Sequence, residues 1–326
     1  MSYSAAKNSQ MQKKLRQEAK ALLEQGKVDC IIGYEPGSLK HATTPLITKD
    51  KAATERLVIN PLIVNNLSNF LPYTKGRIGI VAKGCDSRSI VSLIQDNKVK
   101  REDLFILGVP CSGLIDVSKV EALDGKYRDE IDDISRQGDI ITVKVGAAKK
   151  EFSLSQVMFD NCLACELPTP AEYDVLLGEP TSPIGAAAES AGKLDELKAM
   201  TAAQRWAFWQ NEFRRCTRCY ACRNVCPACY CKRCFVDETE PQWLAPMPQE
   251  PDNLMFQIIR NLHVSGRCTD CGECERTCPV NIPLRALTRD MYDIVDELFE
   301  FKSGMDTKTQ PLLTAYEVDE AEDLVK

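Results

Sequence analysis

The sequence has 326 residues, of which 44% are hydrophobic and 27% are charged, so we expect a folded chain long enough for two domains. Its net charge of −6 argues against a nucleic-acid partner, because binding to phosphates requires a basic face. The sequence contains no run of 18 apolar residues, so we expect no membrane span. The polar amino-terminal stretch does not resemble a secretion signal. We therefore expect a cytoplasmic protein whose thiols stay reduced. The two histidines, His41 and His263, lie far apart, which argues against a cysteine–histidine zinc finger, a Rieske centre or a catalytic histidine pair.

The first half of the chain predicts an α/β domain. Hydrophobic periodicity changes repeatedly between the helical and the extended pattern, and strands separated by helices indicate a largely parallel sheet. The predicted elements are a helix over 5–25, a strand over 28–34, strand–turn–helix units over 76–96 and 103–116, and an exposed hairpin from 141–146 and 151–157.

The composition shifts over residues 166–192, which are rich in Pro, Ala, Ser and Gly, and the second half of this stretch indicates a linker. A helix is predicted over 195–215, where Trp206, Trp209 and Phe213 share one face that we expect to pack against the protein. A second amphipathic helix is predicted over 283–301, and the acidic end after it is expected to be loosely docked.

Eleven of the sixteen cysteines lie between positions 216 and 278, in a motif that occurs twice. The motif reads C-x2-C-x2-C-x3-C-P. In two-cluster ferredoxins, three such cysteines bind one [4Fe–4S] cluster and the fourth binds the other cluster. The proline suits the first turn of a helix, where no backbone donor is lost. The two copies are Cys216, Cys219, Cys222, Cys226 and Pro227, and Cys268, Cys271, Cys274, Cys278 and Pro279.

We therefore predict two [4Fe–4S] clusters that share ligands across the repeats. The ligands of one are Cys216, Cys219, Cys222 and Cys278, and those of the other are Cys268, Cys271, Cys274 and Cys226. Two zinc ribbons are the alternative, because C-x2-C pairs also suit tetrahedral zinc, but the third thiol and the Cys-Pro pair favour iron–sulfur. The expected organisation is an α/β domain over 1–180, a linker over 181–200, an α+β two-[4Fe–4S] ferredoxin-like domain over 201–300 and a helical C-terminal tail over 301–326.

The two motifs differ in the charges around them. Because reduction adds a negative charge, nearby cations favour the reduced form, and we hypothesise that the first cluster has the higher potential. The alternative is that the basic residues bind an acidic patch on a partner. The residues concerned are Arg214, Arg215, Arg218 and Arg223 at the first motif, and Asp270, Glu273 and Glu275 at the second.

Three further cysteines, Cys229, Cys231 and Cys234, directly follow the first motif. They suggest another metal site whose fourth ligand comes from elsewhere in the chain. A fourth iron–sulfur cluster, zinc, and thiols that merely line the neighbouring cluster are all open.

A third [4Fe–4S] cluster is predicted in the first domain. Cys85 and Cys111 each follow a predicted strand, and adjacent parallel strands bring such loops together at the carboxyl edge of the sheet. Cys162 and Cys165, in NCLAC, complete a set of four. Four separate buried cysteines are the alternative. Cys30, inside the first strand, is expected to be a core residue.

The stretches IVAKGCDSRSI, ILGVPCSGLID and FDNCLACELPTPAEYDVLLGE resemble the β-subunit family of deazaflavin (coenzyme F420)-linked hydrogenases and dehydrogenases. RWAFWQNEFRRCTRCYACRNVCPACYC and GRCTDCGECERTCPVNIP look like the iron–sulfur β subunit of formate dehydrogenase, and similar chains accompany heterodisulfide-reductase-type flavoproteins. The resemblance covers roughly residues 28–300. It implies a [4Fe–4S] cluster at the strand-end cysteines, beside an FAD. KGCDSR departs from the G-x-P-C-type loop of many members, and no deazaflavin pocket is evident.

The FAD that the resemblance implies has weak candidates at one strand-to-helix turn. Such a turn holds a phosphate in many proteins, although a capped turn is the alternative. The candidates are Lys83, Gly84, Ser87 and Arg88.

These observations favour an iron–sulfur electron-transfer subunit of a cytoplasmic multi-subunit redox complex, with no substrate turnover of its own. Its expected partners are a catalytic subunit of formate dehydrogenase or hydrogenase type and a flavoprotein of heterodisulfide-reductase type. The first alternative is an FAD-containing oxidoreductase that exchanges hydride with a deazaflavin or a nicotinamide. The second is an interaction module stabilised by zinc.

Overall fold

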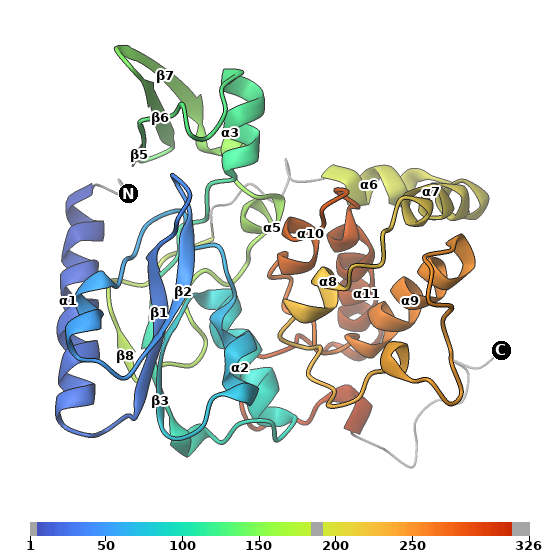
Figure 1. Cartoon of the computed structure of the whole chain (residues 1–326), viewed down its shortest axis with the longest axis horizontal. Helices are drawn as coiled ribbons and strands as arrows, with labels where there is room; N and C mark the ends of the chain where they lie inside the picture. Colours follow the sequence, from blue (N-terminus) through green and yellow to red (C-terminus); the bar gives the residue numbers. More distant parts are fainter. Residues whose placement is uncertain (1–4, 184–191, 315–326) are drawn as a thin grey trace.

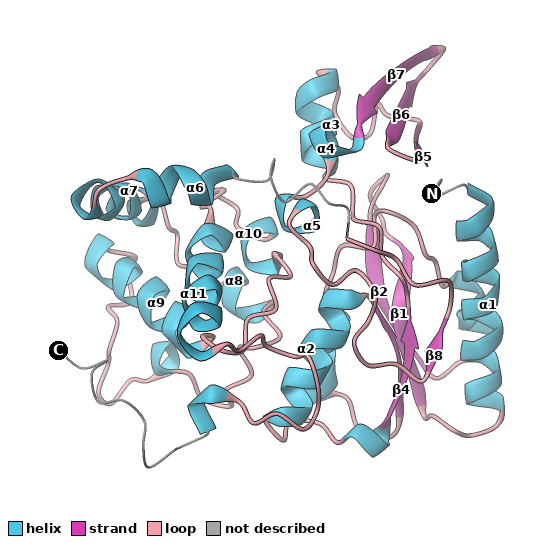
Figure 2. Ribbon diagram, turned by 180° about the vertical axis from the view of Figure 1, so that it is seen from behind, coloured by secondary structure: helices cyan, strands magenta, loops and turns pink. Residues whose placement is uncertain are grey.

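The computed structural model describes residues 5–183 and 192–314 (Figure 1). They form an α/β half, a small antiparallel sheet attached to it, and a cysteine-rich helical half (Figures 1 and 2). None of the helices in these two ranges is long and apolar enough to cross a membrane.

The α/β half is built on a five-stranded sheet of order β2-β1-β3-β4-β8, in which β2 is antiparallel and the other strands are parallel. The predicted, largely parallel sheet is thus confirmed. Every residue of β3 is buried, as expected for a parallel strand that is covered on both faces. The strands are β1 (Cys30–Pro36), β2 (Thr43–Thr48), β3 (Ile78–Ala82), β4 (Leu104–Gly108) and β8 (Val175–Leu176).

Helices cover both faces of this sheet (Figures 1 and 2). The predicted first helix is α1 (Ala5–Glu24), which buries Leu15, Ala19 and Leu22 at helical spacing. On the other side of the sheet, α2 (Gly84–Gln95) follows β3 directly, as predicted. Short 3-10 helices connect the elements at Ala52–Arg56, Leu67–Tyr73 and Arg101–Asp103.

The small sheet has three antiparallel strands rather than the predicted two. The extra strand comes from a polar segment that shows no clear hydrophobic alternation, and only the central strand buries Ile141 and Val143. The end of the predicted hairpin is instead a short helix, and the helix expected within 103–116 starts at Val117. The elements are α3 (Val117–Asp124), β5 (Asp133–Gln137), β6 (Ile140–Val145), β7 (Ala148–Ser153), α4 (Leu154–Val157) and α5 (Asp160–Leu163).

The helical half corrects the expected α+β ferredoxin-like domain, because the described residues 192–314 contain helices and loops but no strand. The cysteine loops here rest on helices instead of a sheet. The elements are α6 (Gly192–Ala199), α7 (Ala202–Arg214), α8 (Ala221–Asn224), α9 (Glu250–His263), α10 (Glu273–Arg276) and α11 (Leu284–Phe299), with 3-10 helices at Phe235–Asp237 and Leu312–Thr314.

The helix predicted over 195–215 is two helices. Thr201 caps the second one in a capping box with Gln204, which stops α6 and starts α7. The end of the expected linker, from Gly192 on, is therefore helical, and its residues 184–191 lie outside the described residues.

Two of the three residues of the aromatic face predicted on this helix, Trp209 and Phe213, pack as expected. Phe213 is buried in the core of the helical half, and Trp209 stacks on it with ring centroids 5.3 Å apart. Trp206, one turn earlier, is half exposed. Phe256 of α9 and Leu284 of α11 complete this core around Cys222 and Cys274.

The described part of the expected loose tail is docked against the α/β half. Arg88 of α2 is buried and donates from Nε and Nη2 to the Ser303 carbonyl oxygen, at 2.9 and 2.8 Å. Gly304 has a φ of +73°, and a Cβ there would overlap the backbone of Arg88. Residues 315–326 of the tail lie outside the described residues.

We predict that Gly304→Ala lowers the free energy of unfolding more than Gly125→Ala does. Both glycines have a positive φ, which costs an alanine about 1 kcal/mol or more, but only Gly304 also meets another backbone. Urea denaturation of the two variants measures the difference. Equal losses would show that residues 303–304 are not pressed against α2.

Candidate functional site

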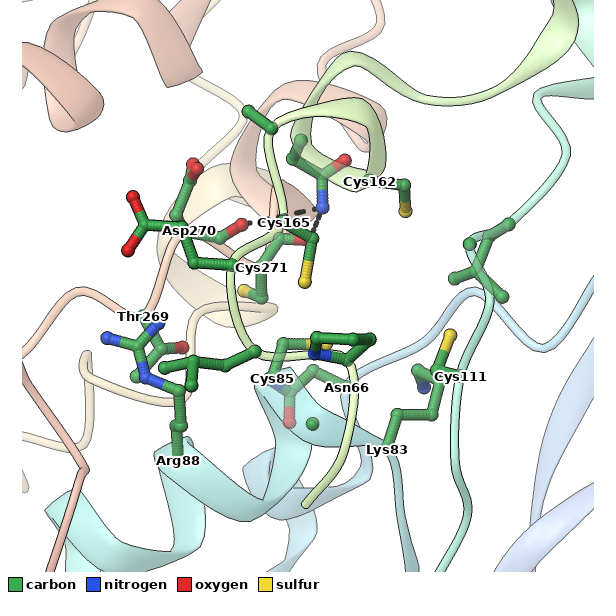
Figure 3. A pocket seen from close by; sticks show the side chains of 18 of the residues that line it. Asn66, Lys83, Cys85, Arg88, Cys111, Cys162, Cys165, Thr269, Asp270 and Cys271 are labelled. Carbon is green, nitrogen blue, oxygen red and sulfur yellow. Dashed lines mark hydrogen bonds between the residues drawn. The ribbon is translucent and has the colours of Figure 1, made fainter. Parts of the chain in front are cut away.

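The four cysteines predicted to bind the third cluster line one cavity, and the sheet topology brings two of them, Cys85 and Cys111, to the same edge (Figure 3). Cys85 lies in the first turn of α2 after β3, and Cys111 follows β4, the neighbouring parallel strand. Cys162 on α5 and Cys165 just after it complete the lining. We call these four cysteines the third set.

The cavity is closed on its other side by the second cysteine motif. Thr269, Asp270 and Cys271 of that motif line the same cavity as the third set (Figure 3). Asn161 of α5 donates from Nδ2 to the Cys271 carbonyl oxygen at 3.1 Å, which ties the two halves together here. The third set is therefore contiguous with the repeat region.

The loop that carries Cys165 lies directly over the start of α2. A Cβ at Gly84 would overlap the Leu167 carbonyl oxygen, so only glycine admits this approach. The Cys111 amide donates to the Pro168 carbonyl oxygen at 3.0 Å. These contacts hold Cys85, Cys111 and Cys165 around one space.

A buried ion pair lies beside the third set. Lys83 Nζ donates to Asp86 Oδ2 at 2.8 Å and to the Asn65 carbonyl oxygen at 2.9 Å, and it also bonds the Tyr34 hydroxyl. The side chains of Lys83 and Asp86 are 1% and 0% exposed. The unfavourable free energy of burying either charge is offset only while the opposite charge is present.

The thiols of the third set are poorly placed to ionise without a cation. Burial raises the pKa of Cys85 well above its usual value, that of Cys162 to about 12 and that of Cys165 to about 11. Thiolates are the form that binds metal, so the charge of a bound metal would have to offset this burial. Four converging soft sulfur donors suit an iron–sulfur cluster.

The two repeated motifs adopt matching backbone conformations. The second residue after the first cysteine is left-handed in both, at Arg218 and Asp270, and so is the fourth, at Tyr220 and Gly272. The third cysteines fall in equivalent short helices, α8 and α10. The sequence repeat is therefore a structural repeat.

Cysteines of the two motifs lie close to one another, since Cys222 and Cys274 share a core against which Cys216 and Cys278 pack. Burial raises the pKa of Cys216, and negative charge on Cys278 raises it further. Burial, followed by charge on Asp270, Cys274 and Cys226, raises the pKa of Cys268 to about 12. We call Cys216, Cys219, Cys222 and Cys278 the first set, and Cys268, Cys271, Cys274 and Cys226 the second set.

Two acidic residues of the second motif are paired with arginines, Asp270 with residues of α11 and Glu273 with a residue of the motif itself. Asp270 accepts from Arg285 at 2.7 Å and from Arg289 at 3.2 Å, both on α11. Glu273 pairs with Arg276 at 2.5 Å. These arginines neutralise much of the negative charge that the motif shows in sequence.

The arginines of the first motif are similarly matched by carboxylates. Arg218 faces Asp252 at 3.5 Å. Arg214 pairs with Glu250 at 3.0 Å, Arg215 with Glu212, and Arg223 with Asp237 at 2.9 Å. The difference in local charge, on which the expected order of potentials depends, is thus largely cancelled by folding.

The three additional cysteines occupy different environments. A hydrogen bond between the Cys226 and Cys229 side chains lowers the pKa of Cys229, so Cys229 lies against a ligand of the second set. Cys231 is exposed, and Cys234 is half-buried. Among the described residues, no three His, Cys, Asp or Glu side chains gather closely enough to hold a single metal ion. A site at these three cysteines stays a prediction.

The weak flavin candidates are engaged by the protein itself. Lys83 is held in the buried ion pair, Ser87 exchanges hydrogen bonds of 2.8 Å with the backbone of Glu172, and Arg88 binds Ser303. These contacts do not favour a phosphate at this turn, and the role of these residues in flavin binding stays a prediction. Cys30 is 1% exposed inside β1, which confirms it as a core residue.

A second cavity, of about 420 Å³, lies beside the third set and was not anticipated from the sequence. Its lining comes from the start of β2, the start of α3 and the second motif, so no single segment reveals it. We call it the side cavity, and its charged or polar lining includes His41, Asp116, Arg128, Glu275 and Arg276.

Comparison with known proteins identifies relatives. No family model matches the chain. F420-dependent formate dehydrogenase subunit beta of Methanocaldococcus jannaschii is 24% identical, over 72% of this chain and 76% of the relative. F420-dependent formate dehydrogenase 1 subunit beta of Methanococcus maripaludis is 22% identical, over 73% and 75%. The chain is a distant homologue of these β subunits.

The homology to these β subunits agrees with the resemblance seen in the sequence motifs. Among solved structures, the F420-reducing [NiFe] hydrogenase complex from Methanosarcina barkeri contains a chain that aligns with a TM-score of 0.40 and 12% identity. That alignment covers 51% of this chain and 64% of the hydrogenase chain, less than two thirds of its length.

We predict that Lys83→Met lowers the free energy of unfolding by about 3–5 kcal/mol, because it leaves Asp86 buried without its partner. Urea denaturation measures the loss. The control is Lys126→Met, which breaks an exposed pair with Glu130 and should cost at most about 1 kcal/mol. Similar losses in the two variants would contradict the buried pair beside the third set.

Proposed function

We propose that this chain is the iron–sulfur electron-transfer subunit of a multi-subunit oxidoreductase. The observation that carries the proposal is the structural repeat of the two motifs. They match in their left-handed residues and in the short helix at the third cysteine, and Cys216, Cys222, Cys274 and Cys278 meet in one core. Two-cluster ferredoxins bind their clusters with two such motifs that exchange the fourth cysteine.

The first and second sets would each hold one [4Fe–4S] cluster, and the third set would hold another. Such a cluster, when bound, supplies one-electron storage that needs little change in geometry. The chain contributes thiolate ligands, buries them away from water and places charged and hydrogen-bonding groups around them. Cys229, Cys231 and Cys234 are retained as a candidate fourth cluster or zinc site.

The contacts among the sets support a relay function. Cys271 belongs to the second set and lines the cavity of the third, while Cys226 and Cys278 interlock the first set with the second. Cys219, of the first set, is exposed. The first set is thus the one with a ligand open to a partner, and the third set is enclosed between the two halves.

The relatives support the choice of partners. Both are named as β subunits of F420-dependent formate dehydrogenases, and each is covered over about three quarters of its length. We infer a catalytic partner of formate dehydrogenase or hydrogenase type and a flavoprotein partner of heterodisulfide-reductase type, in the cytoplasm. Substrate turnover would belong to those partners.

A flavin-containing oxidoreductase is the second candidate, and the side cavity favours it. Its volume of about 420 Å³ lies in the range of small-molecule sites. Its lining includes the guanidinium groups of Arg128 and Arg276, which are also paired with Glu121 and Glu273. FAD would then exchange hydride with a deazaflavin or a nicotinamide. Flavin released from anaerobically purified protein in a one-to-one ratio to the chain would favour this candidate. Absence of flavin would leave the electron-transfer subunit as the remaining candidate.

We predict that the anaerobically purified chain is brown and contains about twelve iron atoms, four for each of three clusters. Cys271→Ser should remove about four of them and reduce electron transfer through the complex, while the dye-linked activity of the catalytic partner is kept. Cys30→Ala is the matched control, because Cys30 is a buried cysteine outside the three sets.

Iron analysis, visible absorption and EPR spectroscopy measure the outcome. A pale, iron-poor protein would contradict the proposed function and would favour the zinc-stabilised module. Full iron and unchanged electron transfer in the Cys271→Ser variant would contradict the role of the second set.

A further inference from the structure

Helix α9, between the two cysteine motifs, has a polar face that is buried. Asn253, Gln257, Arg260 and Asn261 fall on one side of the helix at helical spacing, and their exposures lie between 2% and 5%. Ile258 and Leu262, by contrast, are 38% and 51% exposed. A helix that buries polar groups and exposes some of its apolar ones is the reverse of an ordinary surface helix.

This buried face contacts the ligands of the first set. Asn253 Nδ2 donates to the Cys216 carbonyl oxygen at 2.8 Å. Gln257 Nε2 lies 3.8 Å from Cys216 Sγ and 3.9 Å from Cys222 Sγ, within hydrogen-bonding distance of sulfur. Arg260 Nη2 donates to the Cys222 carbonyl oxygen at 3.1 Å. The face therefore follows the first motif along its length.

Each of these four side chains also has a polar atom without a hydrogen-bond partner among the described residues. The atoms are Asn253 Oδ1, Gln257 Oε1, Arg260 Nε and Asn261 Oδ1. Buried groups of this kind are costly to leave unpaired and are uncommon in folded proteins. Their number on one short face indicates that the face serves something other than packing.

Arg260 is a buried cation of the repeat region. The thiolate charges of Cys274, Cys226, Cys229 and Cys222, which come from both repeats, act on it and raise its pKa, against the opposing effect of burial. Within the described ranges it forms no salt bridge to a carboxylate, whereas Arg214 is exposed and paired with Glu250. Arg260 thus carries a positive charge toward the cysteines that no nearby acid neutralises.

We propose that Gln257 and Arg260 are positioning residues that raise the reduction potential of the clusters held by the repeats. This inference rests on the proposed function. Gln257 donates to two ligand sulfurs of the first set, and Arg260 places its guanidinium group against Cys222 of the same set. Hydrogen bonds to sulfur and nearby positive charge both stabilise the reduced form, which holds one more electron. Arg260 differs from the four arginines of the first motif, which are paired with carboxylates.

The test is an EPR-monitored potentiometric titration of the full anaerobic chain, with dithionite as reductant and mediator dyes. Arg260→Met should shift the reduction potential of at least one cluster of the repeats to a more negative value by about 59 mV. This shift corresponds to a tenfold change in the ratio of reduced to oxidised cluster at a fixed potential. Arg260→Lys keeps the positive charge and should leave the reduction potential close to that of the wild type. Arg214→Met is the matched control and should leave the potentials unchanged.

Gln257→Leu is an independent variant that keeps Arg260. It should lower the potential of the first-set cluster alone, since Gln257 reaches Cys216 and Cys222. Iron content is measured in every sample. If Arg260→Met loses iron, Gln257→Leu decides the matter, and an unchanged potential of the first-set cluster in that variant overturns the inference.

The two proposals fail in different ways. Iron-replete Arg260→Met protein with wild-type potentials, or with the same shift as Arg214→Met, overturns the role of Arg260 and leaves the electron-transfer function standing. Wild-type protein without iron overturns the proposed function itself.

Discussion

The central constraint on this protein is the burial of thiols in numbers that an ordinary core does not need. Burial raises the pKa of cysteines in all three sets, so the interior opposes the ionised form that metal binding requires. Cations of the chain itself lie close to these thiols. Lys83 lies beside the third set, Arg276 beside the second and third, and Arg260 between the first and second. Buried cysteines and buried cations thus lie side by side in the fold, which accounts for the polar groups in its interior.

Much of the site is predictable where it depends on local spacing or on sheet topology. The repeated motif implies that Cys226 and Cys278 exchange places, and the parallel strands imply that Cys85 and Cys111 meet at one edge. The contribution of Cys271 to the same cavity was not predictable, because it depends on how two halves dock. The side cavity was missed for the same reason. The strand content of the repeat region was predicted wrongly, since helices and loops support the motifs here.

Electrostatics is the part that sequence proximity describes worst. The first motif is basic and the second acidic in sequence, yet most of these charges are paired with opposite charges in the fold, through residues distant in sequence such as Arg289 and Glu250. Arg260 attracts no notice in sequence, because a polar residue on an amphipathic helix normally faces water. Only the orientation of α9 about its own axis in the fold shows that its polar face is buried. Which charges remain unbalanced is therefore a property of the tertiary structure.

The docking of Ser303 and Gly304 on α2 has a mechanical consequence. The chain leaves α11, returns to the α/β half and is fastened there by the buried Arg88 guanidinium, while Asn161 forms a second tie at Cys271. Contacts of Ser89 with Thr269 and of Asp96 with Arg267 join the same halves, so they are attached at several points that lie far apart in the chain. Under the proposed function, such multiple attachment would keep the distances between the three sets of cysteines fixed, and electron tunnelling depends steeply on distance.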